Sequence, residues 1–133
     1  MRVVLDTNVV VSMLLDAPAL RPLFEAFRRG TLEPVLTEAT LDELRDVLAR
    51  ERLKIDPGAR EEFLAVLRLN AVWLSHPLPV FDRSDPGDNA VLSAAVTAQA
   101  ILVTGDHALQ RLHPFRQTVP VLSPREFIQR FLA

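Results

Sequence analysis

The stretch Arg2-Val3-Val4-Leu5-Asp6-Thr7-Asn8 decides the fold of this chain. Its apolar residues follow one another without a break, which is typical of a strand that is buried on both faces of a parallel sheet. The acid that ends the run stands where such a strand gives way to a helix. Because open α/β sheets bind ligands at the carboxyl ends of their strands, this acid indicates a functional site.

The rest of the chain continues the alternation of short apolar runs with helical patterns. Strands are expected over residues 2–5, 34–36, 71–74, 101–104 and 118–122. Helices are expected over about 9–15, 20–29, 37–50, 56–69 and 107–112, and from Asp85 and Ser123 onward. The order predicts an α/β fold of three layers, α/β/α, in a single domain over residues 1–133. Its sheet would be mainly parallel, with about five strands and helices on both faces.

Several of these helices carry start signals. Thr37 is expected as an N-cap, and Asp56 and Asp85 each precede a proline, the pairing of N-cap and N1 residues that begins many helices. Ser123 and Glu126 form a capping box at the last helix. Residues 90–96 are apolar almost all round, so the helix that contains them is expected to be buried.

Composition narrows the chemistry that the chain can perform. The chain has 133 residues, 49% of them hydrophobic, and no cysteine, which excludes disulfides, thiolate zinc sites and a cysteine nucleophile. The three histidines, His76, His107 and His113, are too scattered to indicate a zinc site. Any metal is therefore expected to be a hard ion that prefers oxygen ligands.

Charge and hydropathy bear on partners and location. The formal net charge of −2 is not that of a typical nucleic-acid-binding protein, although acids gathered around a metal would lower the sum. No signal peptide is visible, and no apolar stretch approaches the roughly 20 residues needed to span a membrane. We expect a soluble, cytoplasmic protein without a membrane partner.

Four acids stand at transitions between strands and helices. Asp6 ends the first strand, Asp106 follows the run Ile101-Leu102-Val103-Thr104-Gly105, and Glu43 and Asp88 lie early in two helices. Carboxylates crowded at one sheet edge would repel one another unless a divalent cation offset their charge. The pattern therefore favours a metal site.

Asp6 and Glu43, the two acids that come first in the chain, each also have a purely structural interpretation. Asp6 with Thr7 and Asn8 suits a helix cap or an Asx turn. Glu43 would complete a capping box with Thr40 on a helix that is acidic in any case. The buried strand before Asp6 favours function, whereas the residues around Glu43 favour neither interpretation.

The later acids have structural alternatives as well. Asp85 suits an N-cap before Pro86, and Asp88 would place a favourable charge in the first helical turn. Asp106 suits a β–α turn, although Thr104 and Asp106 are also the kind of pair that binds a metal and its water.

Five motifs together resemble one protein family. They are Val4-Leu5-Asp6-Thr7-Asn8, Leu41-Asp42-Glu43-Leu44, Asp85-Pro86-Gly87-Asp88-Asn89, Leu102-Val103-Thr104-Gly105-Asp106 and Pro124-Arg125-Glu126-Phe127. In this order and at these intervals the chain resembles PIN-domain proteins, and closely the VapC-like toxin ribonucleases of bacterial toxin–antitoxin modules. The resemblance covers essentially the whole chain.

The resemblance implies a metal-dependent endoribonuclease that uses Mg²⁺ or Mn²⁺ to hydrolyse RNA. Its catalytic and metal-binding residues would be Asp6, Glu43, Asp88 and Asp106, with Asn8, Asp85 and Thr104 in support. Asp88 is preferred to Asp85 as the main ligand, because it aligns with the acid that begins the alanine-rich helix in the family. A small antitoxin is the implied partner, and the helices over 9–29 and 37–69 offer apolar surface for it or for a homodimer or higher oligomer.

Two alternatives remain open. A phosphatase of the haloacid-dehalogenase type would also place an aspartate after the first strand. It would want a second aspartate where this chain has Asn8, and a late lysine, whereas the only lysine is Lys54. A non-catalytic PIN scaffold that binds RNA or protein is the other alternative, and loss of the acids, which are present here, would signal it.

Overall fold

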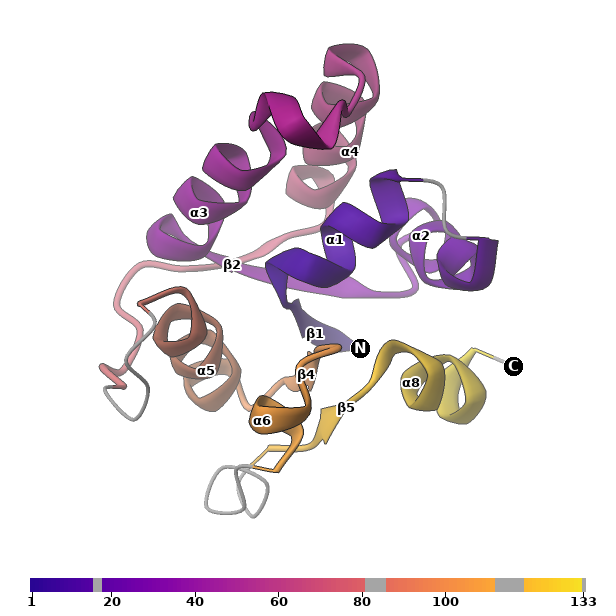
Figure 1. The fold of residues 1–133 in the computed structure, drawn as a ribbon. Coiled ribbons are helices and arrows are strands. Elements are labelled where there is room, and N and C mark those ends of the chain that lie inside the picture. Colours follow the sequence, from indigo (N-terminus) through magenta and orange to yellow (C-terminus); the bar gives the residue numbers. More distant parts are fainter. Residues whose placement is uncertain (16–17, 81–85, 112–118, 133) are drawn as a thin grey trace.

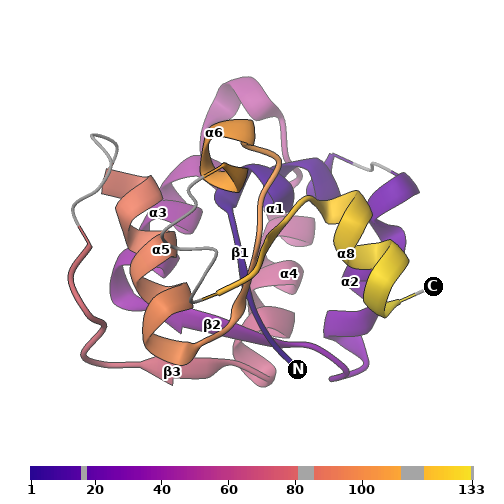
Figure 2. The same ribbon diagram turned by 90° about the horizontal axis from the view of Figure 1, so that it is seen from below.

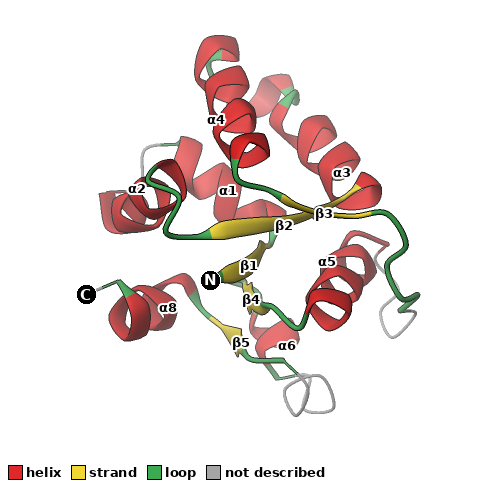
Figure 3. Ribbon diagram, turned by 180° about the vertical axis from the view of Figure 1, so that it is seen from behind, coloured by secondary structure: helices red, strands yellow, loops and turns green. Residues whose placement is uncertain are grey.

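The computed structural model of the chain describes residues 1–15, 18–80, 86–111 and 119–132. Five strands form one sheet, drawn in yellow in Figure 3. They are β1 (Arg2–Leu5), β2 (Glu33–Thr37), β3 (Val72–Leu74), β4 (Ile101–Val103) and β5 (Val121–Leu122). Their order is β3-β2-β1-β4-β5, and all four neighbouring pairs are parallel. The predicted parallel sheet is confirmed, with β1 at its centre.

Helices cover both faces of the sheet and complete three layers (Figures 1 and 2). They are α1 (Thr7–Leu14), α2 (Arg21–Arg28), α3 (Glu38–Leu48), α4 (Pro57–Leu69), α5 (Pro86–Ala98), α6 (His107–Gln110) and α8 (Pro124–Phe131), with short 3₁₀ turns η1 (Pro18–Leu20) and η2 (Glu51–Leu53). Helices α1 to α4 lie on one face and α5 lies on the other (Figure 1). Helix α8 packs against α2 and β5. The predicted α/β/α architecture is confirmed.

The core is divided between the two faces by the alternation of side chains along each strand. In β1, Val3 belongs to the apolar cluster under α1 to α4, whereas Val4 belongs to the cluster under α5. In β4, Val103 joins the first cluster and Leu102 the second. A strand buried on both faces therefore needs the unbroken apolar run that the sequence shows.

Helix starts follow the predicted capping residues. The Thr37 hydroxyl accepts a 3.1 Å hydrogen bond from the Thr40 N–H, and the Thr40 hydroxyl accepts one of 2.9 Å from the Thr37 N–H. The prediction of a capping box between Thr40 and Glu43 is therefore wrong, because Thr40 is already the third residue of α3. The box formed by Ser123 and Glu126 is confirmed.

Some boundaries differ from expectation. Helix α1 begins at Thr7, two residues earlier than predicted, because the carbonyl of Asp6, at the N-cap position, already accepts a 3.0 Å hydrogen bond from the Val9 N–H. The last strand is only Val121–Leu122, because Pro120 has no N–H to donate to a strand ladder. Asp85, the end of the expected helix at Leu112 and the start of the expected strand at Thr118 lie outside the described residues. Within the described part of the chain, none of the helices has the length and apolar character of a membrane span.

Candidate active site

The carboxyl ends of β1 and β4 bring the first candidate residues together. The two strands pair in register from Val3 and Ile101 to Leu5 and Val103. Beyond that pair, the Asp6 N–H donates a 3.0 Å hydrogen bond to the Val103 carbonyl. Asp6 and the residues after Val103 are therefore fixed side by side at the edge where open α/β sheets bind ligands.

Thr104 connects two of the predicted acids. Its side chain is fully buried, and its hydroxyl donates a 2.7 Å hydrogen bond to Oδ2 of Asp6. The same hydroxyl oxygen accepts a 3.0 Å hydrogen bond from the Asp106 N–H. Because Thr104 is anchored to the sheet by a 3.0 Å bond from its own N–H to the Leu122 carbonyl, the bridge has a rigid base.

Asp106 has a structural role at the same place. It is the N-cap of α6, and its Oδ1 accepts a 2.8 Å hydrogen bond from the Ala108 N–H. One turn later, Gln110 Nε2 donates a 2.7 Å bond to the Thr104 carbonyl. Gln110 is absent from the sequence-based set of site residues. Its only sequence signal is its spacing, four residues after Asp106, which places it one helical turn away.

The charge of Asp6 is poorly compensated by the protein. Burial raises the pKa of its carboxyl, and the nearby charge of Asp106 raises that pKa further. The Thr104 hydroxyl and the backbone of Thr7 and Asn8 lower it in part, although Asp6 makes no side-chain capping bond to α1. Among the described residues, no cationic group forms an ion pair with Asp6. A buried carboxylate beside a second acid therefore fits an added cation.

At a second place Glu43 reaches the helical turn that carries Asp88. Glu43 is partly buried on α3, and its carboxylate lies so close to Gly87 that a Cβ added there would overlap it. Gly87 and Asp88 belong to the first turn of α5. Glu43 thus lies against the positive end of a buried helix, in contact with the turn that carries Asp88.

Asn8 is a further predicted site residue. Asn8 is exposed in the first turn of α1, next to Asp6 in the chain. Throughout the described ranges, no three histidine or acidic side chains are grouped closely enough to hold a metal ion. The structure therefore brings together Asp6 with Thr104 and Asp106, and separately Glu43 with the turn of Asp88. Mg²⁺ commonly binds through one or two carboxylates and several waters, so the pair of Asp6 and Asp106 suits such an ion.

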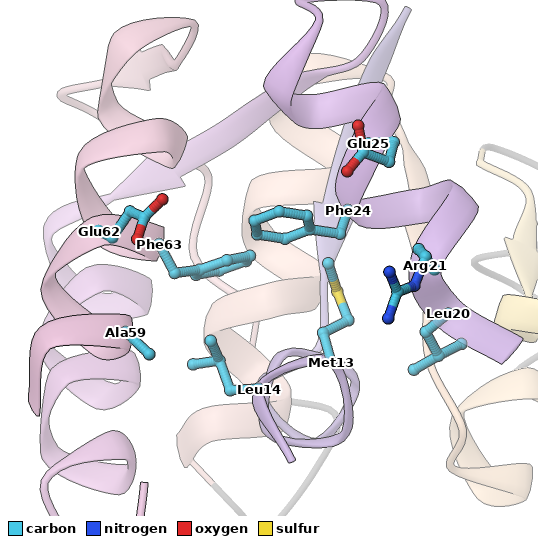
Figure 4. Close-up of a pocket in the computed structure, with 9 residues that line it drawn as sticks. All are labelled: Met13, Leu14, Leu20, Arg21, Phe24, Glu25, Ala59, Glu62 and Phe63. Atoms are coloured by element: carbon cyan, nitrogen blue, oxygen red, sulfur yellow. The ribbon is translucent and has the colours of Figure 1, made fainter. Parts of the chain in front are cut away.

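A groove of about 340 Å³ lies between α1, η1, α2 and α4 (Figure 4). Its floor is apolar, and the rings of Phe24 and Phe63 stack there with centroids 5.6 Å apart. Charged side chains, among them Glu25 and Glu62, stand at its edge. The groove belongs to the helices for which the sequence predicted a partner-binding surface.

The chain belongs to the PIN domain family, because the model of that family matches residues 2–108. The matched range extends from β1 into α6 and contains all four candidate acids. PIN domains are generally nucleases. A comparison with curated proteins found no match.

Solved structures share this fold. A chain in the crystal structure of VapBC2 from Rickettsia felis, bound to a DNA fragment from their promoter, has a TM-score of 0.60 and 13% identity. That match covers 92% of this chain and 98% of the other. A domain of a functionally unknown protein from Methanocaldococcus jannaschii has a TM-score of 0.56 and 19% identity, with 90% and 88% covered. At these identities the likeness concerns the fold.

Proposed function

We propose that this chain is a metal-dependent endoribonuclease that hydrolyses RNA phosphodiester bonds, and that it is the toxin of a toxin–antitoxin pair. One observation carries the nuclease proposal: buried Thr104 holds Asp6 beside Asp106 at the carboxyl edge of a parallel sheet. Membership of the PIN family adds weight to it. We also propose that residues 1–133 form one PIN domain, since strands from residue 2 to residue 122 share one sheet.

In this proposal Asp6 and Asp106 are the main metal ligands. When bound, Mg²⁺ or Mn²⁺ would lower the pKa of a coordinated water and shield the charge of the phosphate. Thr104 fixes the direction of the Asp6 carboxylate through its 2.7 Å hydrogen bond to Oδ2. The only partly compensated charge of Asp6 supplies the attraction for the cation.

The second pair of acids completes the assignment. Asp88 would bind the metal or orient the attacking water. Glu43 would bind a second ion or act as general base, and its position against Gly87 brings it to the same turn as Asp88. Asn8 would position water or phosphate, and Asp85 would support Asp88.

Cleavage of a mixed RNA pool tests the nuclease proposal. Wild-type protein should cut RNA with Mn²⁺ or Mg²⁺ and lose that activity in EDTA, whereas Asp6→Asn and Asp106→Asn should fold normally and leave the RNA intact. Asp42→Asn, which changes an exposed acid on α3, serves as the control and should cut as wild type does. Cleavage by Asp6→Asn at the wild-type rate would refute the assignment.

A small antitoxin is the proposed partner, and the groove of α1, α2 and α4 is the proposed surface for it. The support is the fold shared with a chain of VapBC2 and the apolar floor at Phe24 and Phe63. Where a small open reading frame lies directly upstream of the gene, its co-expression with this chain should yield a complex whose RNA cleavage is blocked. Phe24→Asp should prevent the antitoxin from binding. Light scattering of the chain alone would separately reveal a homodimer or higher oligomer. If Phe24→Asp left the complex intact, the groove would not be the binding surface.

A non-catalytic PIN scaffold that binds RNA or protein is the second candidate. It is favoured by the absence, among the described residues, of a group of three or more metal-binding side chains. A scaffold would retain RNA in a gel-shift assay, and neither Mn²⁺ nor EDTA would change the length of that RNA. Metal-dependent shortening of the RNA would exclude the scaffold.

A further inference from the structure

Helix α6 is a single turn, His107–Gln110, and three contacts anchor it. Leu109 is fully buried in the apolar cluster under α5. The Asp106 carboxylate caps the Ala108 N–H at 2.8 Å. The third contact is made by Gln110, which is partly buried and whose side-chain amide donates to the Thr104 carbonyl at 2.7 Å.

Gln110 contacts both ends of the turn that carries the site. Its side chain reaches the carbonyl of Thr104, and its backbone N–H donates a 3.1 Å bond to the carbonyl of Asp106. Between them, Gly105 is exposed, and a Cβ added there would meet no atom within 4 Å. Side-chain packing therefore does not restrain the middle of this turn, and hydrogen bonds at its two ends must do so.

We propose that Gln110 is a positioning residue that holds the turn of residues 104–106 in the conformation where the Thr104 hydroxyl bridges Asp6 and Asp106. It acts through Thr104 and does not contact the substrate. Its effect on RNA cleavage rests on the function proposed above, but its effect on the turn does not. The alternative is that Gln110 only adds general stability to α6.

Hydrogen exchange in the metal-free protein tests the effect on the turn. Gln110→Met keeps the length of the side chain and removes the donor, and Gln110→Glu keeps the shape while its carboxylate cannot donate at neutral pH. In both variants the Asp106 amide, which is bonded to the Thr104 hydroxyl, should exchange about fivefold faster, the factor expected for one lost hydrogen bond. Amides of β1 such as Val4 should be unchanged.

Gln129→Met provides the matched control, because Gln129 is exposed on α8. It should leave the Asp106 amide at its wild-type exchange rate. If Gln110→Met also left that rate unchanged, or raised the rates of all amides equally, Gln110 would not be a positioning residue.

Cleavage kinetics test the consequence for the site. Gln110→Met should lower kcat several-fold and leave KM nearly unchanged. In a Thr104→Val background it should cause little further loss, because the bridge is already gone. If the losses of activity in Gln110→Met and Thr104→Val were additive, Gln110 would not act through Thr104. A wild-type protein that did not cut RNA would refute the proposed function instead, and the exchange result would still decide the role of Gln110.

Discussion

The hydroxyl of Thr104 donates its only proton to Asp6, a residue 98 positions away, across 2.7 Å. With that proton committed, the hydroxyl oxygen is free to accept the Asp106 N–H, as it does at 3.0 Å. One buried side chain thus fixes the direction of one acid and the backbone of another. Asp6 and Asp106 are therefore linked through a side chain that solvent does not reach.

Removing this hydroxyl should damage both stability and function. Thr104→Val keeps the shape but leaves the buried Oδ2 of Asp6 and the partly buried N–H of Asp106 without a partner, which costs about 1–3 kcal/mol. Urea unfolding would measure the loss, and RNA cleavage should fall with it. Thr104→Ser keeps the hydroxyl and is the control. Equal activity in the serine and valine variants would show that the bridge is unimportant.

The raised pKa of Asp6 predicts a pH-dependent stability. Because the folded state holds the Asp6 proton more tightly than the unfolded chain, stability falls as pH rises from the ordinary aspartate value of 3.8 through the folded-state pKa. Metal-free Asp6→Asn cannot ionise, so it should melt at a higher temperature than wild type at pH 7. Its advantage should vanish below pH 3.8.

Added Mn²⁺ should reverse the order of the two melting temperatures, so that wild type melts above Asp6→Asn. A ligand that binds only the folded state stabilises it, so Mn²⁺ should raise the melting temperature of wild type and leave that of Asp6→Asn unchanged. Thermal melts with Mn²⁺ and with EDTA at pH 7 would measure both effects. If Asp6→Asn were less stable than metal-free wild type at that pH, burial would not be the dominant influence on Asp6.

The two roles of Asp106 can be separated by substitution. Asparagine can also accept from the Ala108 N–H, so Asp106→Asn should retain the stability of α6 and lose Mn²⁺ affinity. Asp106→Ala should lose both, with about 0.5–2 kcal/mol of stability lost with the cap. Calorimetric titration with Mn²⁺, together with urea unfolding, would distinguish them. Wild-type Mn²⁺ affinity in the asparagine variant would remove Asp106 from the metal site.

Gly87 should matter more to activity than to stability. In Gly87→Ala the new methyl group would displace the Glu43 carboxylate, but a flexible side chain can rotate away, and alanine favours a helix over glycine by roughly 1 kcal/mol. We therefore expect near-wild-type melting with reduced RNA cleavage. Asp42→Asn, which changes an exposed acid on α3, is the control and should change neither. Full activity of Gly87→Ala would argue against a role for Glu43.

The fold could be predicted because its signals are local. The apolar run at β1 and the capping residues at Thr37 and Ser123 each depend on neighbouring residues in the chain. The placement of Asp6 beside Thr104 followed from a general rule, that parallel strands end at one edge. Strand ends were less predictable, since Pro120 stops β5 through backbone bonding that a hydropathy pattern does not register.

Contacts between distant elements could not be predicted in the same way. Glu43 lies on α3, and nothing in the residues around it indicates that it reaches Gly87 on α5. Gln110 likewise has an unremarkable place after a histidine and two apolar residues, yet it holds the carbonyl of Thr104. Both contacts depend on how helices pack after the sheet has formed. The roles of the acids themselves stay predictions until the variants are measured.

The central position of β1 has a consequence for the newly made chain. Asp6 is synthesised 98 residues before its partner Thr104. At translation rates of about 5–20 residues per second, the two are separated by roughly 5–20 seconds of synthesis. If the proposed function holds, a ribosome-bound fragment that ends before β4 would carry no cutting activity. The cell would then meet a working nuclease only after β4 has been made, which leaves time for an inhibitor to be present first.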